Sequence, residues 1–302
     1  MNNQKSFLYF LSRYTTQPLV FVPKHNPVAE CDVRLLKNFI SSSKKMAILT
    51  GAGISTESGI PDYRSEEVGL YARSNHKPIQ HLEFVKSAAV RQRYWARNYV
   101  GWQRFSSCRP SVVHYCVRNL EMEQDKVSSV ITQNVDNLHS KAGSKNVIEL
   151  HGTAFRVICL KCGKAYCRYY LQERMTEFNP DMKQTSDMIR PDGDVEIAQD
   201  RIVNFNPPLC DSCNGPLKPD ITFFGDNVPK TRVEAIRSVV SNSDSLLVLG
   251  SSLSVFSGYR IVLQALEEGK RICIVNIGPT RADKLVRKKI SARCGDILPR
   301  VC

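Results

Sequence analysis

The stretch Met46-Ala-Ile-Leu-Thr-Gly51-Ala-Gly53-Ile-Ser55 decides the fold of this chain. Its first five residues form a short apolar run, and glycines follow at once. A buried strand that ends in glycines is typical of a dinucleotide-binding fold, because glycines let backbone N–H groups approach a pyrophosphate. The G-x-G-x-x-G fingerprint of dehydrogenases is broken, since its last position is Thr56. The stretch therefore predicts a phosphate-binding loop after a strand without favouring a dehydrogenase.

Further apolar runs alternate with helical patterns along the chain. The predicted buried strands are 46–50, 129–132, 147–150, 245–249 and 272–275. The predicted helices are 32–40, 114–121, 232–240 and 259–267. This alternation predicts an α/β fold with a Rossmann-like, doubly wound parallel sheet.

Two segments interrupt the alternation and predict a smaller zinc-binding and helical lobe. Residues 71–105 are helical and rich in Arg, Tyr and Trp, and residues 159–216 are rich in loops. We expect the large Rossmann-like lobe to comprise about 28–70, 106–158 and 217–302.

The spacing of the cysteines indicates a metal site. Eleven cysteines, an odd number, do not suggest a disulfide framework in a chain long enough to build a core. Two C-x-x-C pairs, Cys159 with Cys162 and Cys210 with Cys213, each precede a turn that contains glycine. Such pairs can give four thiolates to one tetrahedral Zn²⁺ with no open position, which predicts one structural zinc. A redox dithiol and scattered core cysteines are the alternatives.

Length, composition and charge limit the classes of function. A chain of 302 residues with 42% hydrophobic and 24% charged residues is folded and can bury a sizeable core. No stretch approaches the roughly 18 consecutive apolar residues of a membrane span, so we expect no membrane insertion. The net charge of +13 favours phosphate-bearing ligands or polyanions without choosing among them. We expect no specific nucleic acid as a partner.

The N-terminus has the composition of a mitochondrial presequence. The first 29 residues contain Lys5, Arg13 and Lys24 but neither Asp nor Glu. Hydrophobic residues between positions 7 and 11 can form one apolar face beside these cations. We expect a transit peptide over 1–27 and a mitochondrial matrix location. An untargeted flexible N-terminus is the alternative.

Polar loops after the predicted strands carry a family resemblance. These segments are 51–64, 132–139, 149–152, the two cysteine pairs, 218–226, 250–253 and 275–278. Their order and spacing resemble those of the sirtuins from about residue 30 to the C-terminus. Three further segments are similar to the class II mitochondrial sirtuins, in particular the sirtuin-four subtype: Tyr71-Ala-Arg73, Tyr94-Trp-Ala-Arg97 and Arg190-Pro-Asp-Gly-Asp194.

The resemblance implies an NAD-dependent protein-lysine deacylase. In sirtuins an acyl-lysine carbonyl oxygen attacks C1′ of the nicotinamide ribose of NAD⁺, nicotinamide leaves, and the acyl group passes to ADP-ribose. His151 would be the catalytic base, since it lies between a predicted strand and Gly152, where strand ends face ligands. A neutral imidazole there could remove a proton from a ribose hydroxyl. A solvated or core histidine is the alternative.

The resemblance also implies a set of NAD-binding residues. Asn134 and Asp136 would hold the nicotinamide amide, although a turn that only caps itself is possible from the residues alone. The full set is Gly51, Ala52, Gly53, Ser55, Thr56, Ile60, Pro61, Asp62, Tyr63, Arg64, Gln133, Asn134, Val135, Asp136, Gly250, Ser251, Ser252, Asn276, Ile277, Gly278 and Cys294.

Four residues are candidates for the acyl pocket. Phe223 and Phe224 would line an acyl-lysine tunnel, with a plain hydrophobic core as the alternative. Tyr94 and Arg97 match a Tyr-x-x-Arg pair of relatives that prefer acidic acyl groups, since a guanidinium can grip a carboxylate. A solvated helix face would also explain these arginines. Acidic, lipoyl and biotinyl groups on lysines of mitochondrial metabolic enzymes are the expected substrates.

Three other functions are compatible with parts of the sequence. A protein mono-ADP-ribosyltransferase would use the same NAD site. A nicotinamide oxidoreductase conflicts with the broken glycine fingerprint. A zinc-ribbon nucleic-acid module would rest on the positive charge alone.

Overall fold

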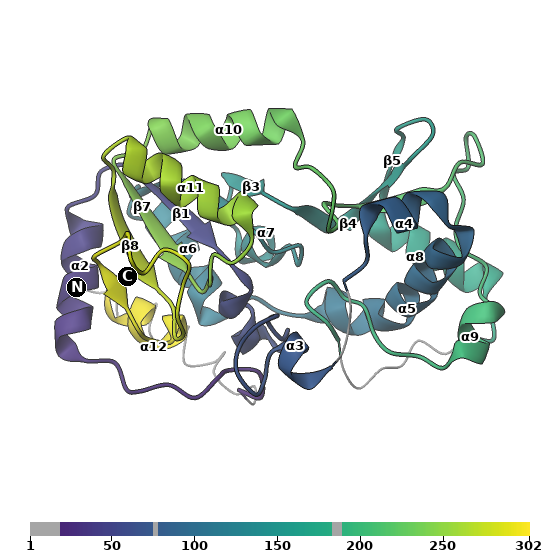
Figure 1. Ribbon diagram of the computed structural model, residues 1–302, viewed down its shortest axis with the longest axis horizontal. Coiled ribbons are helices and arrows are strands. Elements are labelled where there is room, and N and C mark those ends of the chain that lie inside the picture. The colour runs from purple at the N-terminus through teal and green to yellow at the C-terminus, as the bar shows by residue number, and fades with distance from the viewer. Residues whose placement is uncertain (1–18, 75–77, 183–188) are drawn as a thin grey trace.

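The computed structural model describes residues 19–74, 78–182 and 189–302. Within these ranges the chain forms two lobes, a large one around a six-stranded sheet and a small one around a three-stranded sheet (Figure 1). The large sheet has the order β3-β2-β1-β7-β8-β9, and all of its strand pairs are parallel. It is the doubly wound sheet that the alternating pattern predicts.

The central strands of the large sheet are buried on both faces. The strands are β1 (Met46–Thr50), β2 (Val127–Thr132), β3 (Val147–Glu149), β7 (Ser245–Leu249), β8 (Arg271–Val275) and β9 (Lys289–Ile290). Every residue of β1 and β7 is buried. This explains why their sequences are mainly apolar throughout and do not alternate between apolar and polar residues. The pairs Met46 with Ser245 and Thr50 with Leu249 place the carboxyl ends of both strands at the same edge.

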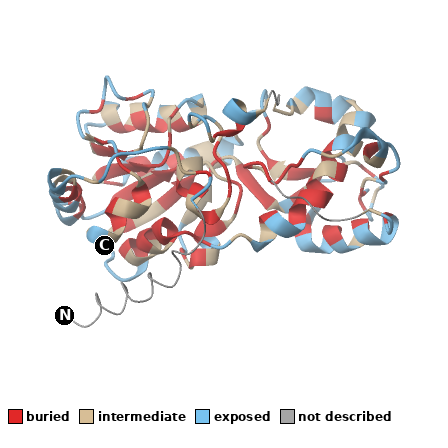
Figure 2. Cartoon of the chain, turned by 90° about the horizontal axis from the view of Figure 1, so that it is seen from below, coloured by how far each residue is buried: buried red, intermediate tan, exposed pale blue. Residues whose placement is uncertain are grey.

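Helices cover both faces of the large sheet. On one face, α2 (Glu30–Ser41), α6 (Val112–Met122), α12 (Cys294–Ile297) and the 3-10 turn η3 (Leu298–Arg300) contribute to one apolar cluster. On the other face, α10 (Lys230–Ser241) and α11 (Phe256–Glu267) contribute to a second. Figure 2 shows the buried residues gathered inside each lobe, with exposed residues on the outer helices. Short elements near the strand ends are η1 (Ala52–Ile54), η2 (Thr56–Ser58), α3 (Leu70–Arg73) and α7 (Leu138–Ala142).

The small lobe combines an antiparallel sheet with helices around an aromatic core. Its strands are β4 (Gly152–Cys159), β5 (Ala165–Cys167) and β6 (Leu217–Ile221), in the order β5-β4-β6. Its helices are α4 (His81–Lys86), α5 (Ala88–Ser107), α8 (Arg168–Phe178) and α9 (Gln199–Val203). Trp95, Tyr99 and Phe105 of α5 are almost fully buried in this core.

The border between the lobes differs from the expected one. The sequence placed 106–158 and 217–302 in the large lobe, but β4 and β6 pair with each other in the small sheet. The chain enters β4 at Gly152, whose φ is +81° and whose Cβ, if present, would lie 1.8 Å from the backbone oxygen of Asp220. Only glycine allows this close approach of the two strands.

The predicted elements of the large lobe are present with small shifts. The strands 46–50 and 245–249 have the expected bounds, and the other predicted strands and helices begin or end one to three residues away. Most of the expected presequence lies outside the described residues. Residues 19–27, however, are described, and Phe21 among them is buried. Within the described ranges, no helix combines the length and apolarity that a membrane crossing requires.

Candidate active site

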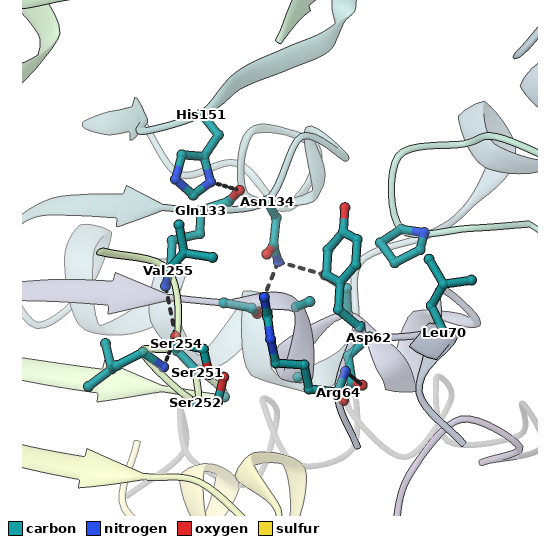
Figure 3. A pocket seen from close by; sticks show the side chains of 18 of the residues that line it. Asp62, Arg64, Leu70, Gln133, Asn134, His151, Ser251, Ser252, Ser254 and Val255 are labelled. Carbon is teal, nitrogen blue, oxygen red and sulfur yellow. Dashed lines mark hydrogen bonds between the residues drawn. The ribbon is translucent and has the colours of Figure 1, made fainter. Parts of the chain in front are cut away.

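A cavity of about 900 Å³ lies at the carboxyl ends of the parallel strands. The segments that follow β1, β2, β7 and β8 all line it. Ligands of doubly wound sheets bind at this edge, where backbone N–H groups and loop side chains converge. Figure 3 shows His151 and Gln133 on one side of the cavity and Asp62, Arg64 and Leu70 on the other.

Almost all of the predicted NAD-binding residues reach this cavity. Every member of the predicted set lines it except Pro61, which is buried. His151, Phe223 and Phe224 also line it. Residues as distant in the sequence as Gly51 and Cys294, 243 positions apart, are therefore brought to one site.

Two glycine-containing loops pack directly against each other beneath the cavity. A Cβ on Gly51 would lie 2.7 Å from the Cβ of Ser251, and a Cβ on Gly53 would lie 2.8 Å from the backbone oxygen of Gly250. Gly250 itself has a φ of +57°. The absence of side chains lets backbone form the cavity floor, as a pyrophosphate site requires.

A buried hydrogen-bond network connects η2 to the loop after β2. Ser55 Oγ donates to Asp136 Oδ2 at 2.7 Å, and the backbone N–H of Leu138 donates to Asp136 Oδ1 at 3.0 Å. Asn134 Nδ2 donates to the backbone oxygen of Gly51 and to Ser55 Oγ, both at 3.1 Å. Burial raises the pKa of Asp136, and the hydrogen bond from Ser55 opposes that shift. The network fixes two polar side chains at the cavity wall.

The hydrogen bonds of His151 determine which ring nitrogen can act as a base. Its Nδ1 lies 3.0 Å from the backbone oxygen of Gln133, which can only accept, so Nδ1 carries the hydrogen. Its Nε2 lies 2.7 Å from Ser257 Oγ and therefore presents the lone pair. Burial lowers the pKa of His151 to about 4, so the ring is neutral near pH 7. Nε2 is thus available to take a proton.

Ser257 is a site residue that the sequence reasoning missed. It lies at the start of α11, shortly after the Gly250-Ser-Ser252 loop, and it lines the cavity. A hydroxyl at the first turn of a helix that follows a strand end was the available signal. Its role depends on its contact with His151, which only the folded structure reveals.

The loop after η2 folds over the cavity and closes on itself. The carboxylate of Asp62 accepts the backbone N–H groups of Arg64 at 3.1 Å and Ser65 at 2.9 Å. The backbone N–H of Leu70 donates to the oxygen of Asp62, and the Arg64 guanidinium lies 5.5 Å from the centre of the Tyr71 ring. This arrangement presents Asp62, Tyr63 and Arg64 to the cavity.

Tyr94 and Arg97 lie behind the cavity wall. Tyr94 packs in the aromatic core, with its ring centre 5.5 Å from that of Phe223. Arg97 Nε donates to Asp194 Oδ1 at 3.0 Å and to the backbone oxygen of Val195 at 2.7 Å. Neither side chain is among the cavity-lining residues, whereas Asp192 from the same 190–196 segment is. The guanidinium that was expected to face an acyl carboxylate is paired within the chain.

The four cysteines of the two C-x-x-C pairs meet at one point of the small lobe. Their sulfur atoms all lie within 4.8 Å of one another, with Cys159 and Cys213 at 3.5 Å and Cys162 and Cys210 at 3.6 Å. Zinc bonds of about 2.3 Å in a tetrahedron separate the sulfurs by about 3.8 Å, so the cluster fits the ion. A Cβ on Gly215 would lie 2.9 Å from Cys159 Sγ, which explains the glycine after the second pair. The predicted zinc-binding cluster is confirmed.

Comparison with known proteins identifies the family. Residues 51–257 match the Sir2 family. The chain is 56% identical over 289 residues to the NAD-dependent protein deacylase Sirt4 of Drosophila melanogaster, with 96% of this chain and 92% of the relative covered. It is 50% identical over 282 residues to the human mitochondrial NAD-dependent protein lipoamidase sirtuin-4, with 93% of this chain and 90% of the relative covered.

Solved structures agree with this identification. A Sir2 protein bound to an acetylated peptide superposes with a TM-score of 0.69 at 28% identity, covering 89% of this chain and 96% of that protein. A Sir2 complex with a p53 peptide and NAD⁺ has a TM-score of 0.68 at 29% identity and covers 88% and 95%. The resemblance that the sequence motifs carry is confirmed, and the chain belongs to the Sir2 family of NAD-dependent enzymes, the sirtuins.

Proposed function

We propose that this sirtuin is an NAD-dependent protein-lysine deacylase that transfers an acyl group from lysine to ADP-ribose and releases nicotinamide. The observation that carries the proposal is the unprotonated Nε2 of His151 at the wall of a cavity built to hold a dinucleotide. A base at that position can remove a ribose hydroxyl proton, and the deprotonated oxygen can then accept the acyl group.

The pKa of His151 suits this role. Because burial holds its pKa at about 4, nearly all of the enzyme carries the neutral base at the pH of a cell compartment. The contact with Ser257 keeps Nε2 directed toward the cavity, and a ribose hydroxyl would take over this hydrogen bond. The backbone oxygen of Gln133 stabilises the ring once Nε2 is protonated, because it remains an acceptor for Nδ1.

The network around Asp136 supports nicotinamide binding. Ser55 holds both Asn134 Nδ2 and the Asp136 carboxylate, so these groups keep fixed positions while the glycosidic bond breaks. A preorganised pocket lowers the barrier because no reorganisation is needed at the moment of reaction. The remaining members of the predicted set would hold the ribose, pyrophosphate and adenine.

The cavity wall favours an acyl chain with apolar length. Ile221, Phe223 and Phe224 line the cavity, whereas the guanidinium of Arg97 is occupied by Asp194 and Glu196. We therefore place lipoyl-lysine first, in agreement with the lipoamidase names of the human and bovine relatives. Biotinyl groups come next, and acidic acyl groups would require Arg97 to exchange partners.

The names of the relatives support a proposal for the substrates and their location. The bovine and human relatives are mitochondrial proteins by name. We propose that acylated lysines of mitochondrial metabolic enzymes in the matrix are the targets, and that residues at the N-terminus direct import.

The test is NAD⁺-dependent nicotinamide release by the purified full chain with acetyl, glutaryl, hydroxymethylglutaryl, lipoyl and biotinyl lysine peptides. Mass spectrometry of the peptide and of the protein distinguishes loss of the acyl mark from transfer of ADP-ribose. Release coupled to deacylation supports the proposal. Release with protein ADP-ribosylation and no deacylation would instead establish an ADP-ribosyltransferase.

A further inference from the structure

The segment before α2 contributes to the wall of the cofactor cavity. Pro23 and Lys24 line the cavity. In Figure 1 the purple segment runs from α2 along the lower edge of the large lobe to the region of α3. We call residues 21–25 the N-terminal strap. The strap has no role in the mechanism proposed above.

The first anchor of the strap is Phe21. It is 7% exposed although it lies outside the helices, nine residues before the start of α2. The Arg73 guanidinium lies 5.1 Å from the centre of its ring, at a distance where cation–π attraction operates. Arg73 ends α3, the last part of the loop that presents Asp62, Tyr63 and Arg64 to the cavity. Phe21 therefore supports the far end of this loop.

The loop transmits that support to its cavity-facing residues. The backbone N–H of Leu70 donates to the oxygen of Asp62 at 2.8 Å, and that of Tyr71 donates to the oxygen of Tyr63 at 3.0 Å. A shift of α3 would therefore move Asp62 and Tyr63 with it. The connection from Phe21 to the cavity passes through one packed ring and two backbone hydrogen bonds.

The second anchor is His25, on the opposite end of the strap. His25 Nε2 lies 3.0 Å from Asp296 Oδ2, and its Nδ1 lies 3.0 Å from the backbone oxygen of Pro23. Asp296 belongs to α12, whose first residue, Cys294, lines the cavity. The next residue, Gly295, donates its N–H to Glu57 Oε1 at 3.1 Å. His25 thus fixes the strap to the segment 294–296, whose first residue lines the cavity.

The third contact of the strap, an ion pair of Lys24, contributes little to its stability. Lys24 Nζ lies 3.1 Å from Glu67 Oε2, but both side chains are largely exposed, at 89% and 68%. Exposed ion pairs of this kind contribute little, because solvent screens them. Phe21 and His25 are therefore the residues that hold the strap.

We infer that the N-terminal strap positions the two loops that grip NAD. Phe21 holds residues 62–73 and His25 holds residues 294–296, so a single chain segment fixes both loops in the binding geometry. Both are positioning residues that act on NAD affinity. The inference rests on NAD as the ligand of the cavity and does not depend on the identity of the acyl group.

The test compares four variants of the full chain by isothermal titration calorimetry with NAD⁺. We expect Phe21→Ala and His25→Ala to weaken NAD binding by about three- to ten-fold, because loosened loops must be ordered on binding. Phe21→Tyr keeps the ring and should restore wild-type affinity. Val20→Ala, at a neighbouring side chain that is 62% exposed, should bind like the wild type. The Kd of an acylated peptide should not change in any of them.

A second readout separates positioning from general stability. Hydrogen exchange of the Leu70 and Tyr71 amides should accelerate in Phe21→Ala, while exchange in the central strand β1 stays unchanged. If Phe21→Ala does not fold, His25→Ala decides, because His25 lies at the surface. Unchanged NAD affinity in the folded variants, or an equal loss of NAD and peptide affinity, would overturn the inference. A wild-type protein that binds NAD⁺ but deacylates no peptide would contradict only the proposed function.

Discussion

At the scale of single residues, three buried histidines set the acid sensitivity of the fold. Burial lowers the pKa of His139 to about 3 and that of His151 to about 4, and it lowers the pKa of His114 well below its usual value. In the unfolded chain each titrates near its ordinary value of about 6.5. Below that pH the unfolded state binds more protons than the native state, so stability falls as the pH is lowered.

We predict that each of these histidines lowers the free energy of unfolding between about pH 6.5 and pH 4, by up to about 1.4 kcal/mol per pH unit. His139→Gln should reduce by one the number of protons that the chain takes up on unfolding, and so make the pH dependence less steep. Glutamine can still bond to Thr50, whose Oγ1 lies 3.0 Å from His139 Nε2. Urea titrations at several pH values measure the slope. An identical slope in the variant and the wild type would show that His139 is not neutral in the native state.

His151→Ala tests the base directly. We expect deacylation to fall by about 10²- to 10⁴-fold, the usual contribution of a positioned base, while zinc content and NAD⁺ affinity stay near wild type. Mass spectrometry of acyl loss, calorimetry with NAD⁺ and metal analysis on the same preparation check these expectations. Turnover close to wild type would remove His151 from the mechanism.

At the scale of elements, the start of α11 packs against the loop that orients His151. A Cβ on Gly258 would lie 2.5 Å from Gln133 Oε1, and the backbone oxygen of Gln133 accepts from His151. Gln133 Nε2 also donates to Ser251 Oγ at 2.8 Å, so a displaced Gln133 would disturb the phosphate loop as well. The close approach of α11 therefore fixes Gln133, and through it both His151 and the phosphate loop at Ser251.

We predict that Gly258→Ala lowers kcat by about ten-fold without lowering the melting temperature. Alanine favours the helix by about 1 kcal/mol over glycine, which offsets the strain of moving one side chain. Kinetics and thermal unfolding of this variant should be compared with Glu267→Ala, an exposed position on the same helix. A loss of stability that parallels the loss of activity would contradict this explanation.

The zinc cluster gives a second prediction at this scale. Cys159→Ser should lose the metal and lower the free energy of unfolding by about 2 to 5 kcal/mol, because β4 and β6 meet at the cluster. Cys167→Ser is the matched control, since Cys167 is exposed and outside the cluster. Metal content by emission spectrometry and urea unfolding are the measurements. Full zinc content in Cys159→Ser would refute the four-cysteine shell.

Local patterns predicted the elements well, but they could not predict contacts between distant segments. The strands 46–50 and 245–249 are continuous apolar runs, and the two cysteine pairs have a characteristic spacing. The partners of Arg97 could not be predicted in this way. They depend on where residues 194–196, almost one hundred positions further along the chain, cross α5. The pairing of β4 with β6 joins residues 58 to 69 positions apart, so local patterns did not predict it and the lobe border differs from the expected one.

At the scale of the whole molecule, the small lobe contributes to the wall of the cavity. Gly101 of α5 lies so close to the 190–196 segment that a Cβ would be 2.2 Å from the backbone oxygen of Gly193. Asp192 of that segment lines the cavity, and burial raises its pKa. Packing inside the small lobe is therefore coupled to the shape of the substrate site.

We predict that Gly101→Ala pushes this segment and changes the KM for acylated peptides by several-fold, while the Kd for NAD⁺ stays unchanged. Overpacking of this kind lowers the free energy of unfolding by about 1 to 3 kcal/mol, so the variant is first shown to be folded. Gln103→Ala, exposed on the same helix, is the control. Kinetics with lipoyl and acetyl peptides measure the effect. A change in NAD⁺ affinity alone would show that the segment serves the other end of the cavity.

The strap connects NAD affinity to any proteolytic cut near the N-terminus, because its residues lie among the first 27 of the chain. A peptidase that cut after residue 27 would discard Phe21, Pro23 and His25, whereas a cut before Val20 would keep them all. Two mature forms that differ by only a few residues would then become saturated at different NAD⁺ levels. If the N-terminus directs import, as proposed above, the position of a cut there would decide whether the strap remains and at which NAD⁺ level the enzyme becomes saturated.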